Sequence, residues 1–250
     1  MYRYKHFHIA FFLLFLLCVF CPHRLPGADD GQFSDSRLSE GSKRLDDFVV
    51  EKAAVRHLTP AGRCSDSVFI RRVYLGVTGS LPPVGKVKRF LASGDADKRK
   101  KLINELLDSE SYADYWALKL SDILRVKSEF PIKLWPNAVQ AYYRWIHNAV
   151  KTNMPADIFA YELLTSSGSN FRVPQVNFYR AVRTKNPDGI AEAAALTFLG
   201  RKFSGMSADE QKNLKNFFSS LIFKGTAEWK EEIVIPDYTK IESVELCYPD

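Results

Sequence analysis

Apolar side chains recur at helical spacing along most of the chain, and this periodicity constrains the fold more than any other feature of the sequence. In the segment 70–77, for example, apolar residues fall at i, i+3, i+4 and i+7: Ile70, Val73, Tyr74 and Val77. Similar stripes occupy the segments 45–53, 102–107, 112–123, 142–149, 190–198 and 214–221. Because each stripe must be buried against another element, the pattern predicts a mainly α, multi-helix globular domain. We find no internal repeat and no sustained heptad, which argues against a solenoid or a long coiled coil.

Local signals mark where two of these helices begin or end. The pair Thr78 and Gly79, followed by Pro82, predicts that the helix over 70–77 stops there. Ser207 and Glu210 form a capping-box pattern, in which each side chain accepts a hydrogen bond from the other residue's backbone N–H. The last helix is therefore predicted to begin at residue 208, with an apolar stripe that continues to residue 221.

Two segments lack the helical pattern. Residues 165–189 contain two glycines, two prolines and three asparagines, a composition that predicts one long ordered loop or two loops. Three consecutive β-branched residues at 233–235 and an apolar alternation at 244–246 predict two short strands. The sequence thus predicts a small β element near the C-terminal end of the helical domain.

The N-terminus has the order of a secretory signal peptide. Two basic residues precede an unbroken apolar run over 9–20, and small residues follow it before an acidic start at Asp29. The run is shorter than the ~20 apolar residues of a spanning helix, so an uncleaved anchor is the less favoured alternative. We predict export to the periplasm or cell envelope of a bacterium, with no membrane-spanning segment after leader removal. The predicted parts are a signal peptide over 1–28, a polar linker over 29–43 and a single helical domain over 44–250.

The charge balance is mild. Removing the leader takes away three of the 35 basic residues and none of the 29 acidic residues, so the net charge falls from +6 to +3. This value is too small to indicate a nucleic-acid partner. The basic run over 98–101 is typical of a solvated helix face, with an anionic glycan or a membrane surface as the weaker alternative.

Few cysteine and histidine side chains remain after the leader. They are Cys64 and Cys247, of four cysteines, and His57 and His147, of five histidines. Their spacing matches no zinc motif, so we predict no metal site and no cofactor. Cys64 and Cys247 permit one disulfide in an oxidising compartment, a pairing that the sequence leaves open.

Five residues on two neighbouring predicted helices form the candidate patch for a ligand or a partner. Asp122 and Arg125 lie one helical turn apart, Arg144 comes from the next helix, and Trp116 and Trp145 add aromatic rings. Such groups suit a sugar-binding cleft, but their helical spacing favours aromatic burial in a shared core and charge pairs that fix helix packing. We find no G-x-S-x-G, P-loop or G-x-G-x-x-G motif, so no catalytic residue is assigned.

The segment 71–83 joins an arginine pair to a Thr-Gly-Ser-Leu-Pro turn, and shorter blocks come after it in order, at 106–116, 122–125, 144–159, 177–180 and 198–201. Together these blocks resemble a domain of unknown function, the PSCyt-two type, from exported, cytochrome-associated proteins of planctomycetes. The resemblance covers residues 45–235. Relatives of this type follow the last block with a C-x-x-C-H segment, whereas residues 201–206 contain neither cysteine nor histidine. The thioether links and axial imidazole of a c-type haem are therefore missing.

The resemblance and the candidate patch support two functional hypotheses. The leading one is a haem-free scaffold or interaction module of the cell envelope, whose partner is an envelope protein or a glycan. The alternative is an envelope polysaccharide-binding protein or hydrolase that uses the Asp/Arg/aromatic cleft. The chain lacks the cytochrome module and second domain common among the relatives it resembles, so we expect either a fragment of a longer protein or a shortened paralogue.

Overall fold

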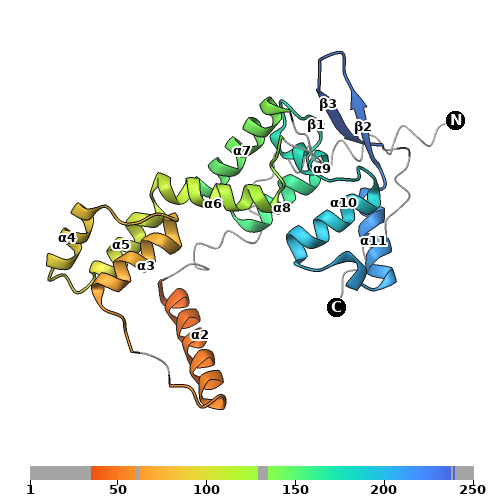
Figure 1. The fold of residues 1–250 in the computed structure, drawn as a ribbon. Coiled ribbons are helices and arrows are strands. Elements are labelled where there is room, and N and C mark those ends of the chain that lie inside the picture. The colour runs from red at the N-terminus through yellow and green to blue at the C-terminus, as the bar shows by residue number, and fades with distance from the viewer. Residues whose placement is uncertain (1–34, 60–61, 129–134, 238, 240–250) are drawn as a thin grey trace. The chain divides into compact units, whose positions relative to one another are not determined.

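The computed structural model describes residues 35–59, 62–128, 135–237 and 239. The chain divides into two compact units, Met1–Arg63 and Cys64–Asp250. Helices dominate the described residues, and one small antiparallel sheet lies near their C-terminal end (Figure 1), which confirms the predicted mainly α class. The predicted signal peptide lies outside the described residues. No described helix is both long and apolar enough to cross a lipid bilayer.

The first unit contributes α2 (Asp35–Val55), which begins inside the stretch that the sequence predicts as a linker. Polar residues are compatible with a helix here, and Glu40 and Arg44, one turn apart, form an ion pair at 2.8 Å. The predicted apolar stripe of this helix is exposed at Leu45 and Phe48, because residues 35–59 contain no second helix to cover it.

The second unit begins with three helices that pack around a small core: α3 (Asp66–Thr78), α4 (Val84–Ala92) and α5 (Lys98–Leu107). This core consists of buried apolar side chains from all three helices, namely Ile70, Tyr74, Phe90, Leu102 and Leu106. As predicted, α3 ends at Gly79, whose φ is +66°. A Cβ at Gly79 would overlap the ring of Tyr115, so glycine is required there for both backbone conformation and space.

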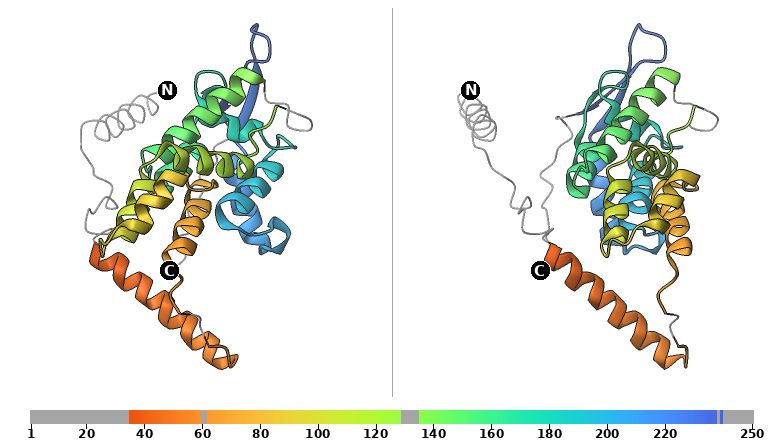
Figure 2. Two further views of the ribbon diagram at one scale, coloured as in Figure 1. Left: turned by 60° about the vertical axis from the view of Figure 1, so that its left-hand side comes forward. Right: turned by 90° about the vertical axis from the view of Figure 1, so that its left-hand side faces the viewer.

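A helix pair joins this small core to a larger one. In this pair, α6 (Glu110–Ile123) and α7 (Pro136–Lys151) lie side by side (Figures 1 and 2), and α8 (Ala156–Thr165) comes next. The larger core is built from side chains of α6, α7, α8 and later elements that are almost fully buried, among them Tyr142, Ile146, Leu163, Phe178, Tyr179, Ile190 and Phe218. The stripe predicted on α7 is buried, as Tyr142 and Ile146 show. The stripe predicted over 112–123 is wrong: α6 buries its small residues Ala113 and Ala117 against the neighbouring helices, and Ile123 is 53% exposed.

The segment predicted as loop contains short elements instead. It holds β1 (Gly168–Ser169), a 3-10 turn (Pro174–Val176) and the buried helix α9 (Asn177–Arg180). The Asn177 side-chain amide donates to the backbone carbonyls of Asn170 and Pro174, at 2.9 and 3.0 Å. These side-chain bonds have no helical or strand periodicity, which explains why the sequence pattern missed the elements.

The next helix changes its winding along its length. Residues Pro187–Ala194 form α10, and the chain continues without a break into a π-helical turn, Ala195–Leu199. Asn186 caps α10 by accepting a hydrogen bond from the Gly189 N–H at 2.8 Å. A left-handed Gly200, with φ of +61°, ends the π-helical turn.

The C-terminal helix and sheet complete the described fold. After a 3-10 turn (Phe203–Gly205), α11 (Ala208–Phe218) starts with the predicted capping box, in which the Ser207 and Glu210 side chains both accept backbone hydrogen bonds. The prediction that its stripe continues to Leu221 is wrong: that residue starts β2 (Leu221–Gly225), because pairing with β3 (Glu232–Pro236) overrides the helical spacing. The sheet order is β1-β3-β2, which confirms the predicted strand at 233–235, while the 244–246 strand lies outside the described residues.

Candidate functional site

Arg125 occupies an unusual backbone position just after α6. Its N–H donates to the Asp122 carbonyl at 3.3 Å, and the Val126 N–H donates to the Ser121 carbonyl at 2.9 Å. These two bonds define a Schellman motif, whose residue in the left-handed conformation is usually glycine. Arg125 has a φ of +60° there. A left-handed conformation costs a side-chain-bearing residue about 1–2 kcal/mol, and such strain is concentrated at functional sites.

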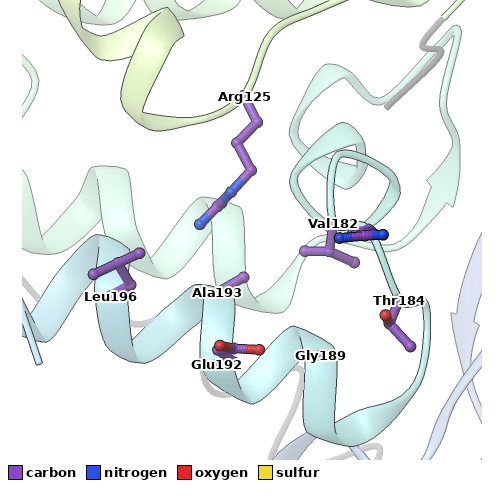
Figure 3. A pocket seen from close by; sticks show the side chains of 8 residues that line it. Arg125, Val182, Thr184, Gly189, Glu192, Ala193 and Leu196 are labelled. Atoms are coloured by element: carbon purple, nitrogen blue, oxygen red, sulfur yellow. The ribbon is translucent and has the colours of Figure 1, made fainter. Parts of the chain in front are cut away.

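This backbone conformation directs the Arg125 side chain toward α10. Figure 3 shows the side chain extending from the loop after α6, with Glu192, Ala193 and Leu196 on the helix opposite. Between them lies a cavity of about 610 Å³, which we call the Arg125 cavity. Its lining comes from the end of α6, the segment after α9, α10 and the π-helical turn, and consists of Arg125, Val182, Arg183, Thr184, Gly189, Glu192, Ala193 and Leu196.

The Arg125 guanidinium is half-buried and has weak partners. Both of its terminal nitrogens lie 3.5 Å from the Thr197 hydroxyl oxygen, the limit of a hydrogen bond. Within the described part of the chain, no carboxylate lies within ion-pair distance of it. Burial lowers the pKa of Arg125 from its usual value, and electrostatic interactions with Tyr142 and Glu192 partly oppose that shift. The guanidinium stays charged, so the cavity holds a partly desolvated cation.

Two buried hydroxyl groups, those of Ser121 and Tyr142, have no hydrogen-bond partner among the described residues. Tyr142 is fully buried, and its hydroxyl interacts electrostatically with Arg125 but forms no hydrogen bond with any described residue. The same holds for the buried hydroxyl of Ser121, the acceptor residue of the Schellman motif. A buried polar group without a partner costs about 1–3 kcal/mol. These two hydroxyls are therefore unsatisfied in the interior near Arg125, although neither residue lines the cavity.

The wall of the cavity that faces Arg125 is held in place by close packing and by ion pairs. A Cβ at Gly189 would overlap the carbonyl oxygen of Thr184, so glycine lets the start of α10 approach the preceding turn. That turn is anchored to the sheet, because the Glu232 carboxylate accepts from Arg180 at 2.6 Å and from Lys185 at 2.8 Å. Burial alone would raise the pKa of Glu232, but the hydrogen bonds from these two cations outweigh it and leave the pKa below 4.5. The ion pairs thus fix the segment that carries Arg183 and Thr184.

The five residues of the predicted patch take different positions. Arg125 lines the cavity, whereas Asp122 and Arg144 are exposed on α6 and α7 and are not among the described lining residues. Trp116 is 39% exposed and donates its indole N–H to the Val77 carbonyl at 3.2 Å. Trp145 packs on the larger core, with its ring stacked on Phe159 at a centroid distance of 4.8 Å. One ring face of Trp145 is therefore already covered.

The other cavity residues carry no functional signal in the sequence. Arg183 and Thr184 lie in the segment predicted as loop, where isolated polar residues carry no motif. Glu192 and Leu196 lie on the exposed side of the predicted stripe over 190–198. The strained backbone of Arg125 has no sequence signal either, since neither glycine nor asparagine marks that helix end.

The cysteine and histidine positions show no metal centre within the described residues. In that part of the chain, no group of three or more histidine, cysteine, aspartate or glutamate side chains is arranged to hold a metal ion. After residues 198–200, Arg201 forms an ion pair with Glu210 at 2.7 Å, and the chain enters α11. These side chains offer no haem ligand, so the residues present do not fit a c-type haem. Cys64 is half-buried and forms no disulfide with a described residue; Cys247 lies outside the described residues, so their pairing stays a prediction.

The fold and the cavity define a class: a mainly helical domain with a cationic cavity between the end of one helix and the face of another. A comparison with protein families then identifies the family of the chain. Residues 44–218 match the model of PSCyt2, described as a protein of unknown function (DUF1549), and the chain belongs to this family. No curated protein and no solved structure matches the chain.

Proposed function

We propose that this chain is an exported, haem-free binding module of the bacterial cell envelope, and that its ligand occupies the Arg125 cavity. The leader-like N-terminus supports export. The observation that carries the binding role is Arg125 itself, a cation held in a strained backbone conformation, facing a cavity of about 610 Å³. The cavity has the size of a small-molecule site, which typically spans about 300–1,000 Å³.

The lining indicates the chemistry of the ligand. Arg125 and Arg183 supply two cationic groups, and a planar guanidinium suits a carboxylate because it can donate two parallel hydrogen bonds. Glu192 disfavours a second negative charge but accepts hydrogen bonds from hydroxyl groups. Val182 and Leu196 add apolar contacts. We therefore propose a small hydroxylated carboxylate, the chemistry of an acidic sugar.

Isothermal titration calorimetry tests the proposal with three probes: glucuronate, glucose and inorganic phosphate. Glucuronate is expected to bind more tightly than either of the others. Arg125→Ala should weaken that binding about 10- to 150-fold, the equivalent of a charge-assisted hydrogen bond of about 1.5–3 kcal/mol. Arg144→Ala is the matched control, because it removes an exposed arginine that does not line the cavity. Equal binding by the wild type and Arg125→Ala would overturn the assignment.

The predicted polysaccharide cleft gives a second candidate, which exposed Asp122, exposed Arg144 and partly exposed Trp116 favour. A glycan array with Asp122→Ala separates the two sites: loss of binding in that variant supports the cleft, and loss in Arg125→Ala supports the cavity.

The proposed absence of haem is tested separately, by absorption spectroscopy and iron analysis. The purified protein is expected to show no Soret absorbance and no stoichiometric iron, and bound haem would contradict it.

A further inference from the structure

The charge of this chain is distributed unevenly. Residues 64–101, which include α3, α4 and the start of α5, carry nine basic and three acidic side chains, a net charge of +6. The rest of the chain from residue 29 onward carries 23 basic and 26 acidic side chains, a net charge of −3. The mild overall balance therefore conceals a strongly basic segment, and its field favours approach to a negatively charged surface.

Helix α4 adds exposed apolar side chains to this basic segment. Val84, Lys88 and Leu91 succeed each other at i, i+4 and i+7, so they form one stripe along the helix. Val84 is 70% exposed and Leu91 is 45% exposed, and Leu81, just before the helix, is 57% exposed. The core-facing side of the same helix is separate, because it contributes Phe90, which is buried.

Cations with no acidic partner lie next to these apolar side chains. A small cleft of about 240 Å³ between α4 and α5 is lined by Lys86, Arg89, Lys98 and Lys101, together with Asp95 and Glu105. Three of these cations are already paired: Lys86 with Glu105, Lys98 with Asp66, and Lys101 with Asp95. Among the described residues, Arg89 and Lys88 have no carboxylate within ion-pair distance, and both are exposed.

We propose that this surface, formed by Leu81, Val84, Lys88, Arg89 and Leu91 and called here the α4 face, rests on a membrane surface rich in anionic phospholipid. Lys88 and Arg89 would contact lipid phosphates, while the three apolar side chains enter the headgroup region. This combination favours a lipid surface over an acidic polysaccharide, because the apolar C–H faces of hydrated sugar rings are small and suit flat aromatic rings, whereas exposed leucine and valine gain more from the apolar part of a lipid layer. The proposal is independent of the Arg125 cavity.

Vesicle co-sedimentation of the processed, exported chain tests this inference. One vesicle set contains phosphatidylcholine alone, and the other contains phosphatidylcholine with phosphatidylglycerol. Binding is expected on the anionic vesicles and should weaken with added salt, since screening shortens the range of the attraction. Removing both cations in Lys88→Ala/Arg89→Ala should weaken binding about 25-fold, at about fivefold for each cation near an anionic surface.

Matched variants distinguish binding through the α4 face from nonspecific electrostatic or hydrophobic binding. Lys212→Ala/Lys224→Ala makes the same charge change at exposed positions on α11 and β2, and its binding should equal that of the wild type. Val84→Ser/Leu91→Ser should weaken binding, whereas Leu118→Ser/Ile123→Ser, at similarly exposed residues of α6, should not. All four variants remove exposed side chains, and circular dichroism verifies that each is folded.

Three results would overturn the inference. The first is equal binding to neutral and anionic vesicles. The second is an equal loss of binding in the α4 variants and their controls. The third is binding to an immobilised polyuronate, lost in Lys88→Ala/Arg89→Ala, without any binding to vesicles, because the partner would then be an acidic polysaccharide.

Discussion

Replacing Arg125 by glycine should stabilise the protein while removing the proposed ligand binding. The residue has a φ of +60° at the position of the Schellman motif where glycine is preferred. A left-handed conformation costs an L residue about 1–2 kcal/mol, and the greater freedom of glycine in the unfolded chain offsets part of the gain. The expected net gain in unfolding free energy is about 1 kcal/mol, or about 2–4 °C in Tm for a domain of this size.

Arg125→Ala provides the comparison that isolates the backbone contribution. Both variants lose the guanidinium and its contacts with Thr197, but alanine keeps the Cβ that makes the left-handed conformation unfavourable. Arg125→Gly should therefore unfold about 2–4 °C above Arg125→Ala in differential scanning calorimetry, and neither variant should bind glucuronate. If Arg125→Ala proved equally stable or more stable, the backbone strain assigned to Arg125 would be refuted.

Three further predictions concern the walls and supports of the same unit. Gly189→Ala should lower the unfolding free energy by about 1–3 kcal/mol, because its Cβ would overlap the Thr184 carbonyl. Gly76→Ala, in an uncrowded part of α3, should raise the unfolding free energy by about 0.5–1 kcal/mol. Urea denaturation compares the two variants, and similar effects would contradict the packing argument. Because the pKa of Glu232 is lowered below 4.5, its ion pairs stabilise the fold fully above that pH and lose this contribution as the pH falls through the lowered pKa. In acid denaturation, the unfolding free energy of Glu232→Gln should therefore fall less steeply with pH in this range than that of the wild type. Identical slopes would exclude the contribution. Ser207→Ala should lower the unfolding free energy by about 1 kcal/mol in thermal denaturation. Ser65→Ala, at a helix start without a side-chain cap bond, should cost less, and equal losses would argue against the capping box.

The sequence predicts the parts of the fold that depend on local signals. Gly79 ends α3 and the Ser207 box starts α11, because each signal acts through backbone groups only a few residues away. The sequence fails where distant partners decide the outcome. Leu221 continues a helical stripe but pairs with Pro236 in a strand, and α9 forms within an expected loop, where Arg180 pairs with Glu232, 52 residues away.

The candidate site shows the same division. The sequence draws attention to Arg125 as a charged residue near the end of a helix, but not to its left-handed backbone, since no glycine marks that position. Arg183, Thr184 and Glu192 come from separate segments, and only the tertiary structure brings them to one cavity. The predicted patch residues Asp122 and Arg144 are exposed outside this lining, and whether they bind a ligand stays a prediction for the glycan array.

The π-helical turn at Ala195–Leu199 also sets the rotational phase of the chain beyond it. A π turn accommodates one more residue than an α turn, and each residue of an α-helix rotates the chain by about 100°. Deleting Ala195 or Leu196, which precede Thr197 in this turn, would regularise the winding and turn Thr197 away from the guanidinium that it now faces. Opposite Arg125, the shape of the cavity wall therefore depends on the number of residues in this turn as well as on their identity.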